Sequence, residues 1–328
     1  MKKILLATTV LAMSAGFAAA DVSVSGDGRM GIVSSDGNSE FWNRTRIKFS
    51  GSGTTDGGLS FGGSFRAGEA GDADENTSSK GSVFISGAFG KITMGSVDSG
   101  DSAAVGQLSS VGFTGLGSGN SISYAADGGE TGTDNDADLT DSAGAKVLYT
   151  YSAGALTVNA STAQLSNDGA NQQAYGLGVS YVAGAMTIAA GYGRNSVEGT
   201  GDLVGATGAI TDMTAAVTYA MGATTLKAIY QNKSVDVTYE DADLNVGTAV
   251  SMGASVDHKI DAITLTAYSI TTDVQSDLID LDVSVNRMGV GVGYDLGGGA
   301  TVKAGWAQIS DVDGESASAM DVGVNFSF

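Results

Sequence analysis

Three short motifs in the sequence could carry chemistry, and each lacks the partners that its chemistry needs. Gly58–Gly62 fits the G-x-S-x-G pattern of a hydrolase nucleophile, but that elbow requires a strand-to-helix turn, and Ser60 instead begins an alternating strand. His258 is the one histidine, and without any cysteine it cannot complete a zinc site of several nitrogen or sulfur ligands. The alternate glycines of 289–293 lie in a strand pattern, without the helix of a dinucleotide-binding turn. We therefore predict that the chain is not an enzyme.

The charged residues that could act on a passing solute form a basic group and an acidic group. The basic group falls on the polar faces of predicted strands, and we call it the basic wall: Arg29, Arg44, Arg46, Lys48, Arg66 and Lys303. These residues are expected to face the lumen of a barrel, because a lipid-facing Arg or Lys at mid-depth costs about 2–4 kcal/mol. The acidic candidates lie in one long loop: Asp98, Asp101, Asp127 and Glu130. Charges on two sides of a pore set its selectivity.

The long loop spans residues 98–143 and separates two regions of strand-like pattern. It is too rich in Gly and Asp for a helix, too irregular for a strand, and contains no Lys or Arg. Loops of this length in compact proteins are usually functional or disordered. We expect it to fold into the lumen, where it narrows a pore. Its later acids are interpreted as a solvated surface that could also bind a cation: Asp134, Asp136, Asp138 and Asp141.

The elements that must position these charges are strands, because polar and apolar residues alternate along most of the chain. Ile47 and Phe49 share one face, whereas Arg46 and Lys48 share the other. Short Gly-containing turns alternate with longer acidic connections, as in outer-membrane barrels. After the long loop we expect strands near 145–153, 155–165, 173–182, 185–195, 209–220, 224–234, 248–258, 262–273, 286–295, 300–310 and 317–328. The predicted fold is an all-β, transmembrane antiparallel 16-stranded β-barrel with an inward-folded third loop.

Aromatic residues and the end of the chain favour a membrane barrel over a soluble sandwich. Rings are expected on the apolar faces near strand ends, where they would form interfacial girdles: Tyr149, Tyr151, Tyr181, Tyr219, Tyr268, Tyr294, Trp306 and Phe326. The chain ends on an apolar face that includes Val322, Val324 and Phe328. Such a strand would aggregate at a free edge, so we expect it to pair with the first strand.

The N-terminal segment and the composition predict export of the chain and argue against a nucleic-acid partner. Residues 1–20 read as a signal peptide, with Lys2 and Lys3 before an apolar run and an A-x-A site ending at Ala20. The mature chain, 21–328, then holds 14 basic residues against 36 acidic ones, which argues against nucleic acid. There is no cysteine and no proline, so the fold must hold without disulfides and its ladders can run unbroken. No stretch is long and apolar enough for a helical membrane span.

Six segments follow one another in this order along essentially the whole chain: VSGDGRMG, GAFGKITMG, VGFTGLG, VLYTYSAGAL, SVDHK and YDLGGGA. Together they resemble the general-diffusion porins of alphaproteobacteria, of the Rhodobacter and Paracoccus type. The resemblance implies a 16-stranded barrel, a homotrimer and a third extracellular loop inside the pore. It also implies charge at Arg29, Arg44, Arg46 and Arg66, and a C-terminal Phe328 that is read by the outer-membrane assembly machinery.

The preferred interpretation is a Gram-negative outer-membrane porin for passive diffusion of small hydrophilic solutes and ions. Its partners would be the lipid bilayer, two further copies of the chain, the assembly machinery and the solutes, with no cofactor. An alternative is a secreted or surface-attached β protein that binds a ligand or Ca²⁺ through acidic loops, since oxygen ligands suit this ion. A barrel selective for one sugar or phosphate would share the preferred fold.

Overall fold

A computed structural model describes residues 21–35, 37–70, 80–127, 146–167, 170–198, 206–239, 242–310 and 315–328. The expected signal peptide and part of the long loop, including Glu130, therefore lie outside the described residues. The first strands are β1 (Asp21–Ser35), β2 (Asn38–Thr54), β3 (Ser60–Ala70), β4 (Lys80–Gly87) and β5 (Gly90–Gly95). The others are β6 (Lys146–Ala153), β7 (Leu156–Asn167), β8 (Ala170–Ala183), β9 (Met186–Glu198), β10 (Ala206–Met221), β11 (Thr224–Tyr239), β12 (Ala242–Ile260), β13 (Ile263–Ser276), β14 (Leu281–Gly297), β15 (Ala300–Ser310) and β16 (Ser316–Ser327).

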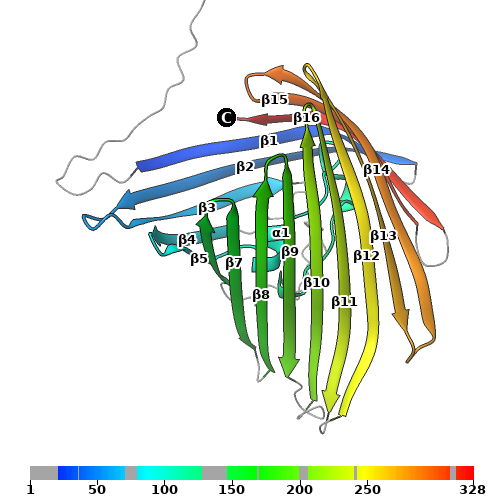
Figure 1. The fold of residues 1–328 in the computed structure, drawn as a ribbon. Helices are drawn as coiled ribbons and strands as arrows, with labels where there is room; N and C mark the ends of the chain where they lie inside the picture. Colours follow the sequence, from blue (N-terminus) through cyan, green and yellow to red (C-terminus); the bar gives the residue numbers. More distant parts are fainter. Residues whose placement is uncertain are drawn as a thin grey trace, which may run out of the picture.

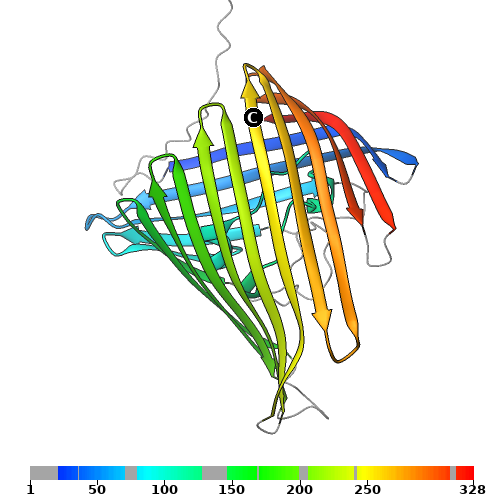
Figure 2. The same cartoon turned by 45° about the vertical axis from the view of Figure 1, so that its right-hand side comes forward.

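The strands form one closed antiparallel barrel in which each strand pairs with its neighbours in sequence and β16 pairs with β1. Figure 1 shows the wall from β7 to β14 in front and the β1–β5 strands that cross behind it, and Figure 2 turns β10–β14 toward the viewer. The closing register runs from Asp27↔Ser327 to Ser35↔Ala319. Beyond it, Gly26 and Phe328 exchange two backbone hydrogen bonds of 2.7 and 2.9 Å. The predicted 16-stranded fold and its closure are confirmed.

Several strands after the long loop extend beyond their predicted ends. For example, β11 continues to Tyr239 and β12 begins at Ala242, whereas the sequence predicted strands near 224–234 and 248–258 with a loop between them. The physical reason is that Val235, Val237 and Tyr239 continue the alternating strand pattern, and the polar residues between them, Asp236 and Thr238, are compatible with a hydrated strand end. A shift of register between Val235 and Asp236 absorbs the irregularity.

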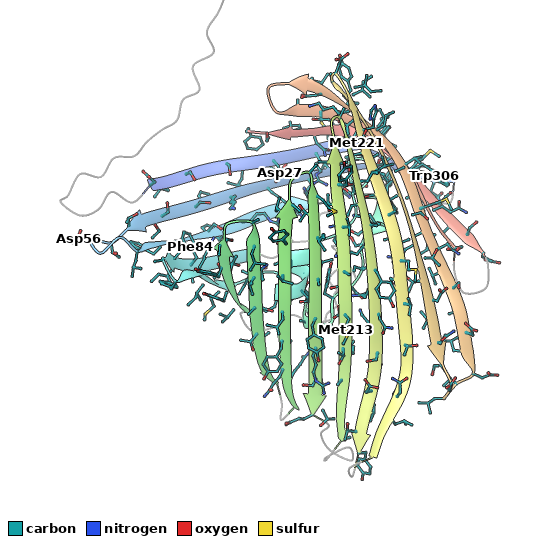
Figure 3. All side chains as sticks on the ribbon, viewed as in Figure 1. Asp27, Asp56, Phe84, Met213, Met221 and Trp306 are labelled. Carbon is teal, nitrogen blue, oxygen red and sulfur yellow. The ribbon has the colours of Figure 1, made fainter. Side chains whose placement is uncertain are left out.

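The barrel carries its large apolar side chains on the outside. Met30 is 56% exposed, Leu177 56% and Val290 54%, fractions that an aqueous surface rarely carries in a continuous band. Figure 3 shows side chains covering this outer surface, with Met213 along β10 and Met221 beside its turn. Such a surface suits hydrocarbon, and it argues against the soluble alternative. Among the described residues, no helix has the length and apolarity needed to cross a membrane.

The buried core lies inside the barrel, between its wall and the described part of the long loop. This part, residues 98–127, is called the inner loop here; it holds the helix α1 (Gly100–Val105) and the 3₁₀ turns η1 (Leu116–Ser118) and η2 (Ala125–Asp127). Val111, Phe113 and Tyr124 are each only 1% exposed. Tyr268 also belongs to this core, at 5% exposure, so its predicted place in an outer girdle was wrong. It shares the inward parity of Thr264 and Thr266, and the loop supplies its apolar cover.

Candidate functional site

The inner loop runs along the barrel wall in two limbs. In the first limb, residues 100–113, α1 packs on β7–β10. The limb ends at Phe113, whose ring lies against Trp42 of β2, with 5.6 Å between the ring centroids. The return limb, residues 114–127, passes β15 and β16 at η1 and reaches β8–β10 at η2. The loop therefore follows the wall from β7 round to β2 instead of crossing the lumen freely.

Inward-facing glycines let the loop lie this close to the wall. At each of them an added Cβ atom would come within 3.0 Å of an atom of the inner loop. We call these positions the glycine belt: Gly31, Gly176, Gly178, Gly191, Gly193, Gly253, Gly289, Gly291, Gly305 and Gly323. Gly289 and Gly291, two of the three alternate glycines of β14 that resembled a nucleotide motif, thus make room for Val111.

Basic side chains of the wall donate hydrogen bonds to carbonyl oxygens of the inner loop. Lys227 Nζ donates to Val105 O at 2.5 Å and to Gln107 O at 2.9 Å. The other bonds are Arg29 Nη1 to Phe113 O at 3.0 Å, Arg287 Nη1 to Ser121 O at 2.8 Å, and Lys233 Nζ to Ser123 O at 2.7 Å. These cations satisfy backbone acceptors that the irregular loop cannot pair by itself.

Acidic side chains of the wall accept hydrogen bonds from the same loop. Asp321 accepts from Thr114 N at 2.8 Å and from Thr114 Oγ1 at 2.7 Å, and Asp212 accepts from Ala125 N at 2.7 Å. Asp257 accepts from the hydroxyl of Ser109. The wall thus holds both limbs through donors and acceptors, from β10 round to β1.

The structure corrects the expected role of Asp101. Its side chain has no solvent exposure and faces the β8–β9 wall, so it cannot present a charge to the pore. Burial raises the pKa of this carboxyl to about 6; a contact with Ser99 opposes the rise, and the Asp212 carboxylate adds to it. The reason is that Asp101 lies in the first turn of α1, which directs its side chain toward the wall instead of the pore. The sequence alone did not predict this helix.

The other described loop acids have different surroundings. Asp127 accepts from Ser99 N at 2.6 Å and forms an ion pair with Lys146 at 3.1 Å, so part of its charge is compensated. Asp98 is exposed to solvent and stays a candidate for the acidic side of the pore. Among the described residues, no three His, Cys, Asp or Glu side chains gather closely enough to hold a metal ion.

The register brings the basic wall onto one face. Arg29 lies opposite Arg44, and Lys48 lies opposite Arg66, so these four side chains point to the same side. Arg46 shares the parity of Arg44 and Lys48 along β2. Lys303 is opposite Gly323, which touches Phe113 of the loop, and is therefore inward as well.

The residues of the basic wall differ in their solvent exposure and in whether their charge is paired. Arg44 is 5% exposed and its Nη2 atom lies 3.0 Å from Asp27 Oδ1, whereas Arg29 is bonded to the loop. Lys48 is exposed and Arg66 is partly exposed. The strongest contribution to a passing ion is therefore expected from Lys48 and Arg66, and the selectivity role of the wall stays a prediction.

Sequence reasoning missed the charged residues that anchor the loop on the later strands. They are Asp212, Lys227, Lys233, Asp257, Arg287 and Asp321. Their inward parity was readable from alternation, but the path of the loop that meets them was not. His258, in contrast, pairs with Thr224 Oγ1 at 2.8 Å beside a turn, and Ser60 begins β3 without a helix after it.

Comparisons with known proteins agree with this geometry. A family model described as Gram-negative porin matches residues 7–328. A protein named porin from Rhodobacter capsulatus is 35% identical over 320 residues, covering 94% of this chain and 100% of the relative. A porin structure refined at 1.8 Å resolution has a TM-score of 0.74 at 32% identity, covering 94% of this chain and 100% of that one. OmpT of Vibrio cholerae, in a trimer form, has a TM-score of 0.72 at 17% identity over 94% of this chain and 100% of its own, which shows the fold alone.

Proposed function

Because the chain belongs to the Gram-negative porin family, we propose that it is a water-filled outer-membrane channel for passive diffusion of small hydrophilic solutes and ions, selected between the basic wall and the inner loop. The observation that carries the selectivity part is the path of the loop along the wall. It is held from β7 round to Trp42 of β2, while Lys48 and Arg66 lie farther along β2 and β3 and form no hydrogen bond with the inner loop among the described residues. Solutes would pass between these two surfaces without any reaction or cofactor.

Further parts of the proposal concern assembly and location. The short turns, such as the one at Gly222, would face the periplasm, and the opposite rim would face outside, as in other bacterial barrels. Residues 1–20 would be removed after export. Phe328 would serve the assembly machinery, and its exposed ring lies over Gly26, where the barrel closes. Three copies would form the working unit, since a protein of the same fold is described as a trimer.

Conductance of the purified protein in planar bilayers tests the channel. We expect stepwise currents that scale with the conductivity of the salt solution, as wide aqueous pores give. Protein that is soluble only in detergent, and that migrates differently when heated, would further exclude the soluble alternative. A preparation that inserts into the bilayer as a folded barrel but carries no current would contradict the proposal.

A further inference from the structure

A cavity of about 510 Å³ lies in the lumen on the side of the inner loop away from the short turns. Its floor is the return limb, including Leu116 and Ile122, and its walls come mainly from β11–β16. The cavity lining divides into an apolar part and a cationic part, and this division points to the chemistry of a solute that would pause there.

The apolar part is formed by the last inward positions of β15 and the first of β16. Gly305 touches Gly112 of the loop, so Ala307 and Ile309, which follow it at alternate positions, also face the lumen. Ile309 remains 45% exposed there, and Ala319 and Leu116 continue the same surface. When a nonpolar group covers an aliphatic surface that is open to pore water, the free energy of the system falls.

The cationic part is carried by Arg287. Among the described residues that line the cavity, Arg287 and Lys233 are the charged ones, and none of them is a carboxylate. Lys233 lies within electrostatic range of Asp212, so its charge is partly balanced. Arg287 donates to Ser121 O at 2.8 Å and to Thr272 Oγ1 at 3.4 Å, and has no carboxylate partner among the described residues. A guanidinium has five N–H donors, more than these two acceptors use.

We propose that this cavity is a subsite for small amphipathic anions, that is, a carboxylate on a compact nonpolar body. The carboxylate would meet the guanidinium of Arg287, and the nonpolar body would cover Ile309 and its alanine neighbours. Arg is suited to this role because its planar fork matches carboxylate geometry. The proposal rests on the proposed channel function and adds a class of solute to it.

The test uses the reconstituted full-length mature channel and three probes, each titrated over the same range of concentrations. Benzoate has both the charge and the nonpolar body, acetate has the charge alone, and benzyl alcohol has the body alone. The measured quantity is the probe concentration that halves the single-channel KCl current. We expect this concentration to be about tenfold lower for benzoate than for either other probe.

Two variants separate the subsite from a general change of the pore. Arg287→Gln should raise the half-blocking concentration of benzoate roughly tenfold, and Ile309→Ser about threefold. Ile309 makes no side-chain hydrogen bond to the loop, so its variant keeps the loop anchors. Lys259→Gln, on β12 near the short turns, is the charge-matched control and should leave benzoate block unchanged.

The results that overturn the proposal differ from those that overturn the channel. Equal block by benzoate and acetate, or unchanged benzoate block in both Arg287→Gln and Ile309→Ser, contradicts the subsite while KCl conductance still supports the channel. Loss of KCl conductance in the unmodified protein contradicts the channel, and the subsite with it.

Discussion

Lys227, Lys233 and Arg287 each donate a hydrogen bond to a loop carbonyl, whereas Lys48 and Arg66 lie opposite each other on β2 and β3. Alternation places all five side chains on inward positions, so the sequence could predict that they avoid lipid. It could not predict which of them a loop would cover, because the contacts join residues more than a hundred positions apart. For the same reason Asp101 and Asp98, three residues apart, have opposite exposures.

The first prediction concerns Lys48 and Arg66. Replacing both by Gln removes two positive charges that water and passing ions can reach, so selectivity should shift toward cations. Each partly screened charge is worth about 1 kcal/mol or less, which corresponds to a change in the cation-to-anion permeability ratio of roughly two- to fivefold. Reversal potentials in a KCl gradient measure this ratio. Arg194→Gln, on the outward face of β9, is the control, and an equal shift in both variants would remove the basic wall from the account of selectivity.

The second prediction concerns the pH dependence of loop attachment. Because the folded state raises the pKa of Asp101 from 3.8 to about 6, its neutral form fits the site. The stabilisation is full below pH 3.8 and is lost as pH rises through about 6, with a cost of up to about 3 kcal/mol for the charged form.

Asp101→Asn should therefore slow amide hydrogen exchange of residues 100–113 at pH 7.5, with little gain at pH 4 after correction for intrinsic exchange. Asp56→Asn, at the tip of the β2–β3 turn (Figure 3), serves as the exposed control. A gain of equal size at both pH values would show that charge burial at Asp101 does not weaken the loop.

At the scale of elements, the glycine belt and the inner loop are complementary parts of one packed interface. The high Gly content was visible in the sequence, and so was the length of the loop. The interface was not, because a glycine in a strand pattern reads equally as a bulge, a weak point or a close approach. The strand types were predicted correctly, and their ends were missed where hydrated strands continue beyond the apolar band.

The third prediction tests this interface at Gly178. An added Cβ would lie 2.1 Å from Gly100 O and 2.5 Å from Ala104 Cβ, so Gly178→Val should force α1 away from the wall. Overpacking of this kind costs about 1–3 kcal/mol, so exchange of α1 amides should accelerate roughly tenfold while the barrel still closes. Gly208→Val is the matched control on β10, because nothing lies within 4 Å of its added Cβ. Unchanged exchange in Gly178→Val would mean that the loop does not depend on the belt.

At the scale of the whole molecule, the distribution of apolar and charged side chains is the reverse of that in a soluble protein. The largest apolar surface faces outward, and the charges that hold the loop face inward. Period-two alternation was sufficient to predict this arrangement, because a single parity decides the face of every residue in a strand. The strand order followed as well, since hairpins join sequence neighbours and only β1 and β16 remain to close the sheet.

The last prediction compares two depths on the outer face of β10. Val217 and Met221 are 42% and 55% exposed, share the outward parity, and lie four residues apart, with Met221 at the turn. Arg at the inner position must reach through hydrocarbon, whereas Arg at the turn can meet headgroups and water. Val217→Arg should therefore lower the free energy of unfolding from lipid vesicles, and so destabilise the barrel, by about 2–4 kcal/mol, and Met221→Arg by about 0–1 kcal/mol. Urea titration of tryptophan fluorescence in vesicles measures both. Equal costs at the two positions would mean that Val217 does not face the hydrocarbon core of a bilayer. The assignment of lipid to the outer face of the barrel would then be wrong.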